Sequence, residues 1–165
     1  MPDPATLSFV VFATLTGLAA ASDLWRLRIP NRIVLGLVAG YLVLLPWHLG
    51  SWGDVAAAMA AAGAVLVAGI VGFARGWFGG GDAKLAAAIA LWLGPAALLP
   101  FLVTTAVLGG VLAFGVICLR PMSVAGAGFL PRWLWQSNQL PYGAALVPAA
   151  LWHFPQGAWA AGWLI

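Results

Sequence analysis

The sequence has very little charge. Only 7% of its 165 residues are charged while 64% are hydrophobic, and long runs such as Ser8–Ala21 and Phe101–Leu119 contain no charged residue at all. A soluble domain needs a solvated polar surface, and this composition is too apolar to supply one. The sequence therefore indicates an integral membrane protein.

Cysteine is almost absent, and its scarcity excludes two kinds of site. The one cysteine, Cys118, lies in an apolar run, so we expect neither a disulfide framework nor a zinc site of paired cysteines. His48 and His153 have no ligand spacing, and we expect no catalytic role for them, no metal and no cofactor. The seven basic residues are scattered over short connections, which argues against nucleic-acid binding.

Apolar runs between charges and helix breakers predict an all-α polytopic membrane protein. A spanning helix takes roughly 20 residues, so the chain has room for about six spans in a single integral-membrane domain, residues 1–165. Gly94-Pro95 closes a short fourth span, while Pro148 and Pro155 predict a kink or a break in the sixth. The expected spans are Leu7–Ser22, Ile33–Gly50, Val55–Phe73, Ala83–Leu93, Ala97–Leu119 and Tyr142–Leu164.

The basic residues predict an orientation, because all of them fall on alternate connections. By the positive-inside rule these connections are cytoplasmic, and both termini lie outside. The first apolar segment lacks the basic region of a cleaved signal peptide, so we expect it to be retained as a span. The residues concerned are Arg26, Arg28, Arg32, Arg75, Lys84, Arg120 and Arg132.

Two of the four acidic residues have ordinary positions, and two do not. Asp3 is close to the start of the chain, and Asp54 is expected in an outer turn as a solvated residue or helix cap. About 16 apolar residues precede Asp23 and cover only ~24 Å of a ~30 Å hydrocarbon core. Asp23 should therefore sit at or just inside the inner boundary, level with Asp82, which opens the fourth span.

Together, Asp23 and Asp82 suggest a catalytic site, since ionisable residues at membrane depth are costly and tend to mark function. Two facing carboxylates can share one proton, as in aspartic proteases. The ionised one takes a proton from the attacking water, and the protonated one polarises the peptide carbonyl. The glycines at 79–81 would let an extended peptide come close and would permit unusual φ and ψ angles.

Each aspartate also has a structural explanation when it is taken alone. Asp23 can pair with Arg26 on the same helix face, and Asp82 can cap a helix that begins at Ala83. A non-enzymatic alternative is a small transporter in which both acids form an ion relay. Transport sites usually lie near the midplane and often between inverted repeats. Both acids here are expected at one face and no repeat is visible, which favours the peptidase.

Three short segments carry a resemblance to a known family. Gly79–Asp82 reads G-x-G-D, the signature of polytopic membrane aspartyl peptidases, and Asp23–Asn31 (DLWRLRIPN) resembles the other signature of the type IV prepilin peptidases. With Pro141–Leu146 (PYGAAL), the order and expected topology resemble that family across nearly the whole chain. Presenilin-like relatives pair G-x-G-D with a Tyr-Asp motif, whereas Ser22 precedes Asp23 here.

The resemblance implies an aspartic-type endopeptidase with Asp23 and Asp82 as its catalytic pair. The implied partners are the lipid bilayer and a prepilin or pseudopilin precursor, whose short leader is removed at the cytoplasmic face of the bacterial inner membrane. Larger members add a cytoplasmic segment with cysteine pairs and an N-methyltransferase activity, neither of which we expect here. The chain resembles the compact TadV/CpaA-like branch that serves Flp-type pili; the particular pilin and the oligomeric state stay open.

The remaining motif positions are expected to shape the site. Pro30 biases Ile29 towards an extended conformation at the turn into the second span. Lys84 can hold Asp82 ionised, meet an acidic group on the pilin, or simply extend to the interface as a snorkelling lysine. The expected substrate-binding or site-shaping residues are Gly79, Gly80, Gly81, Lys84, Pro30, Asn31, Tyr142 and Gly143.

Overall fold

The computed structural model describes residues 3–48, 51–122, 140–157 and 159, and within these ranges every regular element is a helix. This confirms the predicted all-α fold. The elements are α1 (Pro4–Arg26), α2 (Asn31–His48), α3 (Trp52–Ala74), α4 (Gly80–Met122), α6 (Gly143–His153) and a 3-10 turn, η2 (Phe154–Gln156).

Three helical stretches are long and apolar enough to cross a membrane, namely Pro4–Arg26, Trp52–Ala74 and Gly80–Leu119. A shorter apolar helix covers Asn31–Trp47. Such lengths match a hydrocarbon core that takes roughly 20 residues to cross. The helices are therefore those of a polytopic membrane protein, while the number of spans and the side of each terminus stay predictions.

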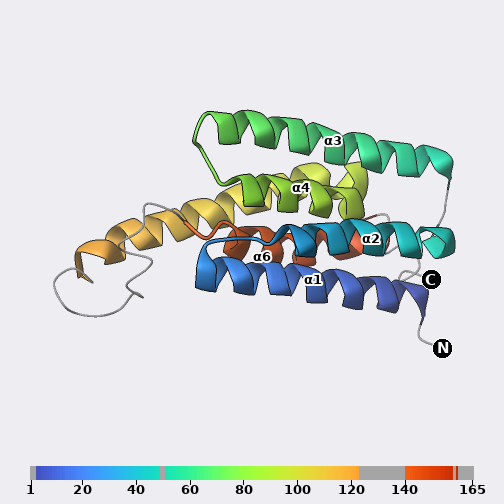
Figure 1. Cartoon of the computed structure of the whole chain (residues 1–165), viewed down its shortest axis with the longest axis horizontal. Helices are drawn as coiled ribbons and strands as arrows, with labels where there is room; N and C mark the ends of the chain where they lie inside the picture. The colour runs from blue at the N-terminus through green and yellow to red at the C-terminus, as the bar shows by residue number, and fades with distance from the viewer. Residues whose placement is uncertain (1–2, 49–50, 123–139, 158, 160–165) are drawn as a thin grey trace.

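Helix α4 is broken at Gly94, as the sequence predicted. Gly94 has φ 69° and ψ 179°, a conformation that essentially only glycine adopts. The chain reverses its direction there, so α4 consists of two arms, residues 80–93 and 95–122 (Figure 1). The first arm covers the residues expected to form a short fourth span.

The first arm of α4 lies at the centre of the bundle. Nearly every residue from Leu85 to Leu93 is buried, as expected for a helix that is apolar on all sides. Helix α4 packs against α2, α3 and α6, while α1 packs against α2 and α6. In Figure 1, α3 and α1 form the two outer layers of this arrangement.

An aromatic cluster fixes the helices to one another around Trp92, whose side chain is fully buried. Its ring centroid lies 5.4 Å from that of Phe12 in α1 and 5.9 Å from that of Tyr41 in α2. Phe12 also stacks on Phe154 at 4.7 Å. The indole Nε1 donates a hydrogen bond of 2.9 Å to the carbonyl oxygen of Leu37, so the buried polar atom is satisfied.

The turns between α1 and α2 and between α3 and α4 lie at one end of the bundle, where α6 also begins (Figure 1). The exposed side chains of Arg26, Arg28 and Arg75 are at this end. Their shared location agrees with the predicted placement of basic residues on alternate connections. The connection that carries Arg132, residues 123–139, lies outside the described residues.

The expected sixth span does not continue as one helix. Helix α6 ends at His153, and Pro155 lies in the 3-10 turn that follows, because proline cannot donate the next helical hydrogen bond. Pro148 lies inside α6 without ending it. Residue 158 and residues 160–164 of the expected span lie outside the described residues.

His153 is held by two hydrogen-bonding partners. Its buried ring pairs with Thr104 Oγ1 through Nε2 at 2.8 Å and with Gln156 Oε1 through Nδ1 at 3.0 Å.

Candidate active site

Asp23 lies in the last turn of α1 and is 5% exposed. Its Oδ2 accepts a hydrogen bond of 2.8 Å from the backbone N–H of Gly143, the first residue of α6. Arg26, the alternative partner that the sequence suggested, is exposed on the surface. The partner that the structure assigns to Asp23 is therefore a helix N-terminus far away in the sequence.

Asp82 is half-buried in the first turn of α4. The helix begins at Gly80 rather than at the expected Ala83, so Asp82 is its third residue and not its cap. The carboxylate accepts from the backbone N–H of Gly79, as the acid of a capping box does. The charge of Asp23 acts on this same carboxyl, so the fold brings the two predicted catalytic residues together.

Asp54 provides an internal comparison, because it holds the corresponding position in α3. Ser51 caps that helix: its Oγ accepts from the backbone N–H of Asp54 at 3.2 Å and lies 2.9 Å from Asp54 Oδ2. Both groups are exposed. The start of a helix therefore does not by itself distinguish Asp82, whereas its proximity to Asp23 does.

The unusual backbone angle in this region belongs to Gly76 rather than to the run 79–81. Among the described residues, the glycines with positive φ are Gly76, at 73°, and Gly94, so the run 79–81 does not adopt the unusual angles predicted for it. Gly76 ends α3 instead: its N–H bonds the carbonyl of Phe73 at 2.9 Å, and Trp77 N–H bonds that of Gly72 at 3.0 Å. This is a Schellman motif, which favours glycine at this position.

The run at 79–81 lies against other groups of the protein, and close approach of a peptide to it stays a prediction. A Cβ added at Gly81 would lie 3.4 Å from the Cβ of Ile29, and one added at Gly79 would lie 2.9 Å from Asp82 Oδ2. The start of α4 therefore lies in ordinary van der Waals contact with the turn between α1 and α2.

The turn between α1 and α2 is held by its own hydrogen bonds. Leu27 adopts the left-handed conformation with φ 51°, and its N–H bonds the carbonyl oxygen of Asp23 at 2.8 Å. Ser22 Oγ donates to the carbonyl of Arg28 at 2.8 Å, and the Pro30 carbonyl accepts from Ile33 N–H at 3.0 Å. These bonds fix the shape of the chain directly after Asp23.

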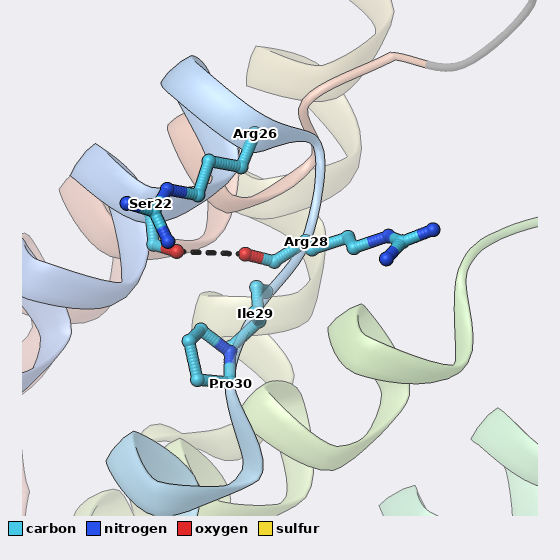
Figure 2. Close-up of a pocket in the computed structure, with 5 residues that line it drawn as sticks. All are labelled: Ser22, Arg26, Arg28, Ile29 and Pro30. Atoms are coloured by element: carbon cyan, nitrogen blue, oxygen red, sulfur yellow. Dashed lines mark hydrogen bonds between the residues drawn. The ribbon is translucent and has the colours of Figure 1, made fainter.

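A pocket of about 560 Å³ opens at this turn, lined by Ser22, Arg26, Arg28, Ile29 and Pro30. Figure 2 shows Arg26 folded back over Ser22, while the Arg28 side chain extends in another direction. Because Ile29 faces Gly81, the pocket adjoins the first turn of α4. The sequence predicted Pro30 here but not Ser22, Arg26 or Arg28, although all lie within or beside the DLWRLRIPN segment.

Lys84 contacts a predicted site residue other than Asp82. Its Nζ donates to Asn31 Oδ1 at 3.2 Å, which joins the first turn of α4 to the first residue of α2. Both side chains are exposed. Tyr142 lies against the second arm of α4, where a Cβ added at Gly109 would be 3.3 Å from its ring.

The arrangement suits acid–base chemistry by two carboxylates, each of which accepts one backbone N–H. Within the ranges that the structure describes, there is no group of three or more His, Cys, Asp or Glu side chains that could hold a metal ion.

Comparison with known proteins gave one finding. The sequence model of the type IV leader peptidase family matches residues 10–114, a range that contains Asp23, Asp82 and the glycines between α3 and α4 but not Gly143. No curated protein and no solved structure matches the chain.

Proposed function

The chain belongs to the type IV leader peptidase family, and on that premise we propose that it cleaves the leader from prepilins or pseudopilins with Asp23 and Asp82 as the catalytic pair. Membership of the family implies an aspartic-type prepilin peptidase activity in general. The residue assignment is supported by the positions of Asp23, in the last turn of α1, and Asp82, in the first turn of α4, at the same end of the bundle and within reach of each other's charge.

The two carboxyl groups divide the chemistry between them. The ionised one takes a proton from water while the water oxygen bonds to the scissile carbonyl carbon, and the protonated one donates a hydrogen bond to the carbonyl oxygen. When the carbon–nitrogen bond breaks, a proton passes to the leaving amine, so the products are a leader carboxylate and a new amino terminus. Each carboxyl group accepts one backbone N–H, Asp23 from Gly143 and Asp82 from Gly79.

The location of the acids supports a peptidase rather than a transporter. Both lie where helices begin or end, at the end of the bundle that carries Arg26, Arg28 and Arg75. A transport site would be expected near the middle of the spans. In the proposed orientation this end faces the cytoplasm, because basic residues prefer that side.

We assign the chain to the compact branch that processes Flp-type prepilins, at the cytoplasmic face of the bacterial inner membrane. The single cysteine of the sequence supports cleavage without methylation of the new amino terminus, because the methylating relatives carry cysteine pairs.

The test is cleavage of a synthetic prepilin peptide by purified protein in detergent. Asp23→Asn and Asp82→Asn should each lower kcat by at least about 100-fold, the scale of general acid–base catalysis. The double variant should be no slower than either single one, because members of one catalytic unit are non-additive.

Asp54→Asn is the matched control, since Asp54 has the same place in its own helix. It should cleave at nearly the wild-type rate. A folded Asp23→Asn protein that cleaves at that rate would refute the proposed function.

A further inference from the structure

The start of α6 contributes a backbone donor to Asp23. The first N–H groups of a helix have no partner within the helix, so each needs one from outside. Gly143 is the first residue of α6, and its N–H donates to Asp23 Oδ2 at 2.8 Å in a buried bond that spans 120 positions of the sequence. The residues matched by the family end at 114, well before this contact.

The absence of a side chain at position 143 is what permits this contact. A Cβ added there would lie 2.8 Å from Asp23 Oδ2, 3.0 Å from its Cβ and 3.2 Å from its Cγ. Real Cβ atoms essentially never come closer than 3.0 Å to a neighbour, so either Asp23 or α6 would have to move.

The neighbouring residues fix where this N–H points. The Tyr142 carbonyl accepts from Leu146 N–H at 3.0 Å, and the Pro141 carbonyl accepts from Ala144 N–H at 3.0 Å. The Tyr142 ring packs against Gly109 in the second arm of α4. The first turn of α6 is therefore held against α4, and this contact fixes its position relative to Asp23.

We propose that Gly143 is a positioning residue for the cleavage reaction. Its N–H holds one oxygen of the Asp23 carboxylate and leaves the other oxygen for water or substrate, and its lack of a side chain sets the distance. This inference rests on the proposed function, because it assumes that Asp23 is catalytic. A purely structural cap would stabilise α6 without affecting the rate of cleavage.

The first test compares glycine-to-alanine variants. Gly143→Ala keeps the N–H but displaces Asp23, and it should lower kcat by about 100-fold, the cost of a misplacement of about 1 Å, with KM changed by less than about twofold. Gly110→Ala and Gly115→Ala are controls, because a Cβ at either position meets nothing within 4 Å. Both should cleave like the wild type. A Gly143→Ala protein that also does so overturns the proposal.

A second variant isolates the hydrogen bond in case Gly143→Ala does not fold. Replacement of the amide nitrogen of residue 143 by an ester oxygen deletes the donor and adds no side chain. The ester protein should show the same loss in kcat, again with KM little changed. Wild-type kinetics from the ester protein would overturn the proposal.

An infrared measurement tests the contact between Gly143 and Asp23 without a cleavage assay. All four acidic residues of the sequence are aspartates. A triple variant with Asp3→Asn, Asp54→Asn and Asp82→Asn therefore keeps Asp23 as its one acidic side chain. Labelling with ¹³C-aspartate then identifies the infrared bands of the Asp23 carboxylate. Its carboxylate bands should shift when Gly143→Ala is added, and unchanged bands would contradict the contact. Shifted bands in a protein whose wild type cleaves no prepilin would support the contact and refute only the proposed function.

Discussion

Asp54 and Asp82 are each the third residue of their helix, but the groups around their carboxylates differ. Asp54 faces Ser51 at an exposed helix start. Asp82 is half-buried, bonds the N–H of Gly79 and experiences the charge of Asp23. The position within the helix therefore does not distinguish the two aspartates. What distinguishes Asp82 is a second carboxylate that comes from another helix.

The contact between Lys84 and Asn31 leads to a prediction for individual residues. If Lys84 serves to hold the start of α4 against α2, Lys84→Leu and Asn31→Leu should each lower kcat/KM by no more than about tenfold, since one exposed hydrogen bond contributes roughly 0.5–1.5 kcal/mol. The double variant should lose no more than either single one. The measurement is the same peptide cleavage assay.

Lys84→Gln is the control, because its amide can still donate towards Asn31. Loss of cleavage in Lys84→Leu but not in Asn31→Leu would show that Lys84 acts on Asp82 or on the substrate instead.

At the scale of elements, small residues let α3 and the first arm of α4 come close. A Cβ added at Gly69 would be only 2.7 Å from the Cβ of Ala83, and one added at Gly72 would overlap the ring of Phe78. Close backbone approach through glycine and alanine is typical of helix contacts in membranes. This contact fixes the first turn of α4, and therefore Asp82, against α3.

Replacement by alanine should destabilise the protein at one glycine of α3 and not at another. Gly72→Ala should lower the free energy of unfolding by about 1–3 kcal/mol, the usual cost of overpacking. Gly63 has nothing within 4 Å of an added Cβ, so Gly63→Ala should be neutral or raise stability by up to about 1 kcal/mol through its helix propensity.

Thermal unfolding of both proteins in the same detergent measures the difference. Equal destabilisation at Gly63 and Gly72 would contradict the packing described for α3 and Phe78.

At the scale of the whole molecule, the orientation in the membrane can be tested by labelling. In a Cys118→Ser background, a cysteine at Ser51 should react with an impermeant thiol reagent added outside intact cells, and one at Arg28 should react only after lysis. Both positions are exposed, so accessibility within the fold does not limit the reaction. The physical reason is the preference of Arg and Lys for the cytoplasmic side.

The Cys118→Ser protein without an added cysteine is the control and should stay unlabelled. External labelling at Arg28 together with protection at Ser51 would reverse the topology and place the proposed active site on the wrong side for a leader peptidase.

The sequence by itself determined the features that depend on composition and on neighbouring residues. Its apolar runs predicted a membrane protein made of helices, Gly94-Pro95 predicted the break in α4, and Pro155 predicted the end of α6. A glycine directly after a helix, such as Gly76, also predicts a positive φ angle, but we expected the unusual φ and ψ angles at 79–81 instead. These features are local, so propensity and hydrophobicity suffice to predict them.

Only the tertiary structure decided which distant groups meet at the candidate site. The motifs identified Asp23, Asp82 and Gly143 as positions of interest, but they did not predict that Gly143 donates to Asp23, or that Lys84 reaches Asn31 rather than Asp82. Such contacts depend on how the helices pack, through buried aromatic rings and close approach at glycines, and neither is visible in the spacing of a motif. The chemistry of the site is therefore encoded locally, whereas its geometry is set by packing across the whole bundle.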